Sequence, residues 1–182
     1  MNFTLTYSGT LKANGSPEHK HDVRREFHKQ LHELWKHSLF ADLTKPDDSL
    51  MKTVGNYKFL PLVASGRNEI AELQIIMLRP ELASGYIVGQ GGDIDNRLKT
   101  LFDSLRIPKE PNEIPISASP DEDESPFFCL LEDDVLITDL SVSTDRLLEP
   151  NTPKSTVKLI IRVQIKRVLR LGESMISRLG RI

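Results

Sequence analysis

The order of apolar patterns along the chain predicts an α+β fold, a single domain in which helices pack on a mixed β-sheet. Short alternating segments, typical of strands, are interrupted by two longer segments whose apolar residues recur every three or four positions, as in helices. These segments do not alternate strictly, which disfavours a doubly wound fold. We therefore expect one domain over residues 1–182, with the approximate order β-α-β-β-α-β-β.

The individual elements follow from the period of their apolar residues. Alternation of apolar and polar residues predicts a strand over 2–12, and apolar segments predict further strands over 57–64, 70–78, 135–143 and 156–167. Spacings of three and four predict helices over 17–39 and 95–105, the first with Ser16 as its N-cap and Pro17 at its first position. The turn signal Ser65-Gly66-Arg67-Asn68 lies between the second and third strands and predicts a β-hairpin over 57–78.

The remaining segments are expected to be irregular. Polar residues predict loops over 42–53 and 79–92. Residues 106–130 are rich in proline and acid, which predicts an inserted acidic excursion or a flexible loop. Residues 166–182 form a basic tail, whose last part is either a short amphipathic helix or a frayed end. The formal net charge of −2 therefore hides separate acidic and basic regions.

The composition is that of a globular protein outside membranes. Hydrophobic residues make up 38% and charged residues 27% of the chain. We find neither a secretory signal pattern nor an apolar run near the ~20 residues that span a bilayer. Cys129 is the single cysteine and cannot form an internal disulfide. We therefore expect a cytoplasmic protein without membrane contact.

Paired carboxylates at the start of the second helix carry the chemical signal. Asp93 and Asp95 are two residues apart, so in an extended backbone both point to the same side. Such a pair repels itself and requires a metal ion, a basic side chain or a helix N-terminus nearby. Lys99 and Asp103 follow at four-residue intervals, within about 80° of Asp95 around the helix. This helix margin therefore presents an acid, a base and an acid.

A second acidic element precedes the next strand. Glu132, Asp133 and Asp134 stand directly before the apolar residues 135–137. If that strand lies beside the helix start, its acids complete a cluster with Asp93 and Asp95. Mg²⁺ binds one or two carboxylates and completes its shell with water and substrate phosphate. The pattern thus predicts metal-assisted cleavage of a phosphodiester, with Lys99 on the phosphate.

This pattern resembles the signature of RusA-like Holliday junction resolvases, over roughly residues 93–145. Members are small dimeric Mg²⁺-dependent endonucleases, typically of phages and prophages, which cut four-way DNA junctions in recombination and repair. The resemblance implies four catalytic residues: Asp93, Asp95, Lys99 and Asp134. It implies Asp93, Asp95 and Asp134 as ligands of Mg²⁺ or Mn²⁺, and Asn96, Asp103 and Asp133 as supporting residues. It also implies branched DNA and a second copy of the chain as partners.

Other interpretations are weighed against this one. Asp95 could serve solely as an N-cap of the helix. Lys99 could serve solely as a surface ion-pair partner of Asp95 and Asp103. His28 and His32 are four residues apart, as helical zinc ligands would be. The H-E-x-x-H pattern that begins at His32 nevertheless fails, because position 36 is Lys and the next histidine is His37. We expect these histidines on a solvated face with His19, His21, Arg24 and other basic residues. The glycines at 89–92 fit no nucleotide-binding motif, so no nucleotide cofactor is expected. A noncatalytic nucleic-acid-binding or regulatory protein on this fold, or a nuclease for flaps or RNA, stays open as an alternative.

Overall fold

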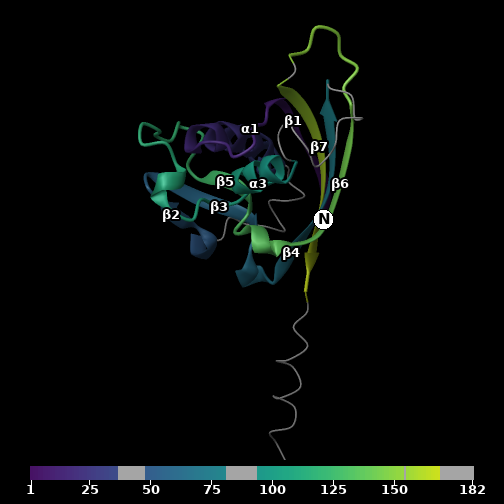
Figure 1. The fold of residues 1–182 in the computed structure, drawn as a ribbon. Helices are drawn as coiled ribbons and strands as arrows, with labels where there is room; N and C mark the ends of the chain where they lie inside the picture. The colour runs from purple at the N-terminus through teal and green to yellow at the C-terminus, as the bar shows by residue number, and fades with distance from the viewer. Residues whose placement is uncertain (37–47, 81–93, 154, 169–182) are drawn as a thin grey trace, which may run out of the picture.

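Two β-sheets and two α-helices make up the described part of the chain. The computed structural model describes residues 1–36, 48–80, 94–153 and 155–168. Figure 1 shows the helices and the smaller sheet gathered on one side of the larger sheet. Both sheets combine parallel and antiparallel pairs. The predicted α+β class with mixed strands and packed helices is therefore confirmed.

The larger sheet contains four long strands. In spatial order they are β1 (Asn2–Thr10), β7 (Thr156–Arg167), β4 (Glu69–Arg79) and β6 (Ile137–Arg146). Strand β7 runs antiparallel to both of its neighbours, and β6 runs parallel to β4. Alternate residues point to opposite faces, so Leu73, Ile75 and Met77 of β4 are buried while Gln74 is exposed. The sheet thus has one apolar and one polar face.

The smaller sheet is more deeply buried. It consists of β2 (Lys52–Val54), β3 (Tyr57–Val63) and β5 (Phe127–Leu131). Strands β2 and β3 form a tight antiparallel pair joined through Gly55, whose φ of 57° lies in the left-handed region that glycine tolerates best. All five residues of β5 are buried, and β5 runs parallel to β3. Its continuous apolar sequence suits a strand covered on both faces.

Both helices start close to where the sequence predicts, and the second also ends there. Helix α1 covers Pro17–Lys36, and the backbone N–H of His19 donates to Ser16 Oγ at 3.4 Å, as expected for an N-cap. Helix α3 covers Ile94–Leu105. Short 3-10 helices η1, η2, η3 and η4 cover Asp48–Leu50, Ser65–Arg67, Pro111–Glu113 and Asp134–Leu136.

One hydrophobic cluster joins both sheets and both helices. Its members include Leu31 of α1, Leu60 of β3, Ile75 of β4 and Leu101 of α3, each fully buried. The guanidinium of Arg24 is buried beside this core and donates to the backbone oxygen of Asp103 at 2.8 Å. Because that bond joins α1 to α3, it fixes the position of the helix that carries the predicted site.

The predicted hairpin over residues 57–78 is wrong. Strands β3 and β4 both form, but β3 pairs with β2 and β5, whereas β4 pairs with β6 and β7. Between them the chain makes the 3-10 turn η2 and then passes through Asn68, which has a left-handed φ of 54°. This turn directs the chain into the other sheet. A turn signal in the sequence is compatible with either outcome.

The acidic insert predicted over residues 106–130 is shorter than expected. Residues 127–130 belong to β5, and Arg106, Ile107, Ile114 and Glu124 are buried. Within the segment, Arg25 of α1 donates to both carboxylate oxygens of Glu124, at 2.7 and 3.0 Å. The segment is therefore a loop that packs on the fold through these buried residues and is attached to α1 at Glu124, while its other acids are exposed or half-buried. The predicted order lacked β5 for this reason, and it also lacked the short strand β2.

Some predictions fall wholly or partly outside the described residues. These are the end of the first helix at 37–39, half of the loop over 42–53, most of the loop over 79–92, Asp93, and most of the basic tail over 166–182. The described half of the first loop contains η1 and the start of β2. Of that tail, Lys166 and Arg167 end β7. Among the helices that the structure describes, none has the length and apolar character needed to cross a bilayer.

Candidate functional site

Helix α3 presents Asp95 and Lys99 to solvent. Asp95 lies in the first turn, where the helix dipole favours an acid, and its Oδ1 accepts the backbone N–H of Asn96 at 2.9 Å. Lys99 is one turn further along and is also exposed. Lys99 forms no ion pair with any described residue. The alternative interpretation, in which Lys99 pairs with Asp95 or Asp103, is therefore not seen among these residues.

Asp103 faces a different environment from Asp95. Its side chain is only 9% exposed and accepts Lys20 Nζ at 2.7 Å and Arg106 Nη2 at 2.6 Å. Burial acts to raise the pKa of Asp103, but the hydrogen bonds and charges of these two partners outweigh it and lower the pKa. Asp103 therefore ties α3 to α1 and to the start of the following loop. Its contacts are those of a structural ion pair, whereas sequence spacing placed it beside Lys99.

The second predicted acidic element caps η4. Asp133 is the N-cap residue, and its Oδ1 accepts the backbone N–H of Val135 at 3.1 Å. Asp134 follows in the first turn of η4, and the two side chains are 33% and 38% exposed. These carboxylates thus reach solvent from a rigid turn that directly precedes β6.

A lysine that sequence reasoning missed lies between these two carboxylates. Lys109 Nζ is 3.1 Å from Asp133 Oδ2 and 3.6 Å from Asp134 Oδ1. Burial acts to raise the pKa of Asp133, yet the neighbouring Asp134 side chain and the hydrogen bonds donated by the Val135 backbone and by Lys109 together lower the pKa to about 2. No local signal in the sequence relates Lys109 to residues more than twenty positions later. The contact arises only from the fold.

The two halves of the predicted site belong to neighbouring elements. Helix α3 lies against η4, and Leu98, Phe102 and Leu136 pack on the same hydrophobic cluster. Asp95 and Asp134 are both at the starts of their elements, where backbone N–H groups favour negative charge. Asp93, the third predicted ligand, lies outside the described residues. The exposed oxygens of Asp95 and Asp134 are of the type that Mg²⁺ binds.

Another group of side chains could hold a metal by distance alone. Ligand atoms of His28, His32 and Asp123 lie within 4.8 Å of one another. However, the N–H of Phe128 donates to His28 Nδ1 at 2.8 Å, so the proton of the neutral ring is on Nε2, which contacts the Asp123 carbonyl at 3.2 Å. A metal on Nε2 would move the proton to Nδ1, against the Phe128 N–H. We interpret this group as a structural contact.

The histidines of α1 also correct the expected solvated basic face. His21, Arg24 and His28 are each no more than 1% exposed. Burial lowers the pKa of His28, although its hydrogen bond to the Asp123 carbonyl and the charge of Glu124 act to raise it. The ring of His28 lies 4.4 Å from that of Phe127. These residues therefore pack α1 on β5 and are not free to contact a nucleic acid.

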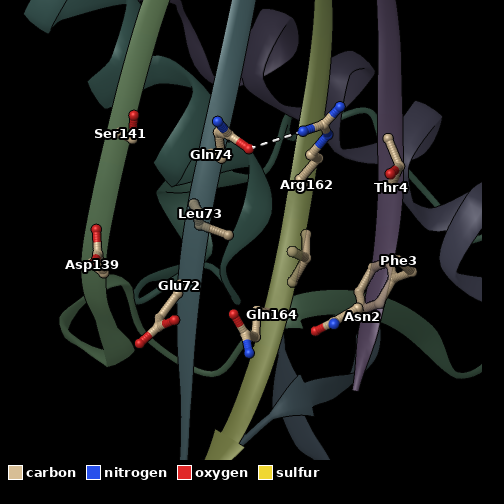
Figure 2. Close-up of a pocket in the computed structure, with 11 residues that line it drawn as sticks. Asn2, Phe3, Thr4, Glu72, Leu73, Gln74, Asp139, Ser141, Arg162 and Gln164 are labelled. Carbon is tan, nitrogen blue, oxygen red and sulfur yellow. Dashed lines mark hydrogen bonds between the residues drawn. The ribbon is translucent and has the colours of Figure 1, made fainter.

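Another hollow of the described structure lies away from these residues. It has a volume of about 510 Å³ and is formed on the polar face of the four-stranded sheet. Figure 2 shows Thr4, Gln74, Arg162 and Ser141 in one row across four strands, with Arg162 donating to Gln74 at 3.3 Å. None of the predicted site residues that the structure describes lines it. A smaller hollow of about 460 Å³ borders Lys109 and Asp133 and is therefore the relevant one.

Comparison with known proteins leaves the chain without an assigned family. No protein-family model matches it, and no curated protein matches it.

Proposed function

We propose that the chain is a Mg²⁺-dependent endonuclease of RusA-like type that cuts branched DNA. The observation that carries this proposal is the contact between α3 and η4, because it brings two elements with exposed acids together beside an exposed lysine. Asp95 and Asp134 supply hard oxygen ligands, and Asp93 is the third proposed ligand. In the described residues, Lys99 has no ion-pair partner that would compete with a phosphate.

The proposed roles follow from the charges of these side chains. Asp95 and Asp134 hold the cation, which when bound neutralises charge on the phosphate and acidifies an attacking water. Lys99 places its ammonium near the scissile phosphate and stabilises negative charge that develops there. Asp133 orients the start of η4 by accepting the Val135 N–H, and the backbone N–H of Asn96 orients the carboxylate of Asp95. Asp103 supports the site only indirectly, through its ion pairs.

A homodimer would present two such sites to opposite strands of a junction. This arrangement is the one that paired nicks require, and it belongs to the proposal together with a cytoplasmic role in recombination or repair.

The proposal is tested by cleavage of a labelled synthetic four-way junction with and without Mg²⁺. We expect paired nicks that require Mg²⁺ and are lost in Asp95→Asn and Asp134→Asn. Asp139→Asn is the matched control, because Asp139 is an exposed carboxylate on β6 that lines the hollow on the other face of the sheet. Flap, single-stranded and RNA substrates run in parallel identify a nuclease of different specificity. A folded protein that cuts none of them would refute the proposal.

A noncatalytic nucleic-acid-binding protein is the second candidate, and Lys109 favours it. The ammonium of Lys109 offsets half of the combined charge of Asp133 and Asp134 without a metal, which weakens the need of these acids for one. Salt-sensitive binding of junction DNA without cleavage in Mg²⁺ or Mn²⁺ would support this candidate.

A further inference from the structure

Lys109 is held beside the acids of η4 by the backbone that precedes it. Arg106 forms a parallel bridge with Leu131 at the end of β5, and the N–H of Ile107 donates to the Leu131 carbonyl at 3.0 Å. The two segments therefore run side by side, and three residues after Arg106 the chain reaches Lys109 opposite Asp133. The lysine side chain is 51% exposed, so only its head group is fixed.

A groove connects Lys109 to a second lysine. It has a volume of about 460 Å³ and is lined by residues of β2, by residues 107–109, and by Glu132 and Asp133. Lys52 of β2 lies on this groove and pairs with Glu132 at 2.7 Å. Two ammonium groups thus border a groove that leads to the acids of η4.

The two lysines differ in how much their carboxylates depend on them. Glu132 also accepts the backbone N–H and the hydroxyl of Ser65, each at 2.7 Å, so it stays satisfied without Lys52. Asp134 has Lys109 as its nearest cation among the described residues, at 3.6 Å. The Lys109 ammonium therefore lies where a divalent cation on Asp134 would bind, and its positive charge would repel that cation.

We propose that Lys109 is an internal counter-ion of Asp133 and Asp134, that a divalent cation displaces it, and that the released ammonium binds a phosphate of a nucleic-acid strand in the groove. This inference rests on the proposed function. Lys109 and the cation compete for the same oxygens, so the lysine weakens metal binding in the absence of substrate. A phosphate that captures the released ammonium removes this competition. Binding of metal and of nucleic acid is then mutually favourable, by the same factor in each direction.

The first measurement is Mn²⁺ affinity without nucleic acid, by calorimetry, for wild type, Lys109→Met and Lys52→Met. We expect Lys109→Met to bind Mn²⁺ about tenfold more tightly, because a unit charge next to the ion is removed. Lys52→Met is the matched control and should change the affinity by less than about twofold, since its ammonium serves Glu132. Lys109→Gln repeats the test with a polar side chain, and thermal denaturation confirms that each variant is folded.

The second measurement is the affinity for a labelled four-way junction, by fluorescence anisotropy, in EDTA and in Ca²⁺. In wild type Ca²⁺ should tighten binding, and in Lys109→Met this gain should shrink by about tenfold, in step with the tighter metal binding. Wild-type Mn²⁺ affinity in folded Lys109→Met and Lys109→Gln would overturn the inference, as would an unaltered gain from Ca²⁺.

The two proposals fail in distinguishable ways. Metal-dependent cleavage by wild type, together with unchanged Mn²⁺ affinity in the Lys109 variants, refutes only the role of Lys109. Tighter Mn²⁺ binding in those variants, without cleavage of any substrate by wild type, refutes the nuclease and keeps the counter-ion. A wild type and Lys109 variants that all fail to bind Mn²⁺ refute both.

Discussion

Replacing Asp103 with asparagine separates the stability of the site from its chemistry. The substitution keeps the shape of the side chain but removes a charge that two cations share, Lys20 at 2.7 Å and Arg106 at 2.6 Å. Arg106 is only 7% exposed, so its guanidinium cannot regain water without rearrangement. Breaking a buried pair costs roughly 3–5 kcal/mol.

Two features place the expected loss for Asp103→Asn at the low end of that range. Arg106 keeps Glu113 as a second partner at 3.0 Å, and the Lys20 side chain is 21% exposed and can turn to solvent. We therefore expect the free energy of unfolding to fall by about 3 kcal/mol. For a domain of this size that loss corresponds to roughly 6–12 °C in Tm.

Urea denaturation followed by circular dichroism measures this loss, with Asp95→Asn as the comparison. Asp95 is exposed at a helix start, so its replacement should cost no more than about 1 kcal/mol while abolishing the proposed cleavage. Asp103→Asn should retain cleavage at temperatures where it is folded. A loss below about 1 kcal/mol for Asp103→Asn at an unchanged denaturant slope would refute the reasoning that this ion pair is structural.

Three further outcomes are expected. Burial, followed by the charges of Arg24 and Arg25, lowers the pKa of His21 from 6.5 to about 4. Between pH 6.5 and pH 4 the unfolded chain binds more protons than the folded chain, so the free energy of unfolding should fall by up to about 3 kcal/mol as the pH drops across this range. Urea titrations at several pH values measure this fall, and an equal pH dependence in His21→Gln would contradict the prediction. Leu31→Ala removes a fully buried side chain of α1 and should lower the free energy of unfolding in urea by about 2–5 kcal/mol, without changing cleavage below its Tm. A loss under about 1 kcal/mol would show that the core rearranges to fill the cavity. Lys99→Ala should lower the cleavage rate at least about 100-fold while unfolding free energy changes by less than about 0.5 kcal/mol, and the reverse result would make Lys99 a structural residue.

The sequence predicted elements whose signals are local. Helix α3 was predicted because helically spaced apolar residues and a first-turn acid occur together in one short segment. Strand β7 was predicted because its apolar and polar residues alternate over a long segment. Strand β5 was missed because its five residues are uniformly apolar and follow an acidic, proline-rich stretch. Such a short run has no period by which a strand could be recognised.

The contacts of the candidate site depend on partners distant in the sequence. Helical spacing places Asp95, Lys99 and Asp103 within one arc, but it cannot reveal that Lys20 of α1 lies next to Asp103 alone. In the same way, only the parallel run of residues 106–109 beside the end of β5 brings Lys109 to Asp133. The acids were thus visible in the sequence, whereas the cations that balance them were not.

The central place of β7 in the larger sheet has a consequence for synthesis on the ribosome. Strand β7 pairs with β1 on one side and β4 on the other, and the N-terminal ammonium donates to Ile165 at 3.0 Å. Strands β1 and β4 therefore have no common partner until residues 156–167 emerge. Until then, the edges of β1 and β4 that β7 covers stay unpaired in the nascent chain, and unpaired strands are prone to aggregate. Completion of this sheet therefore waits for residues 156–167, which place β7 between β1 and β4.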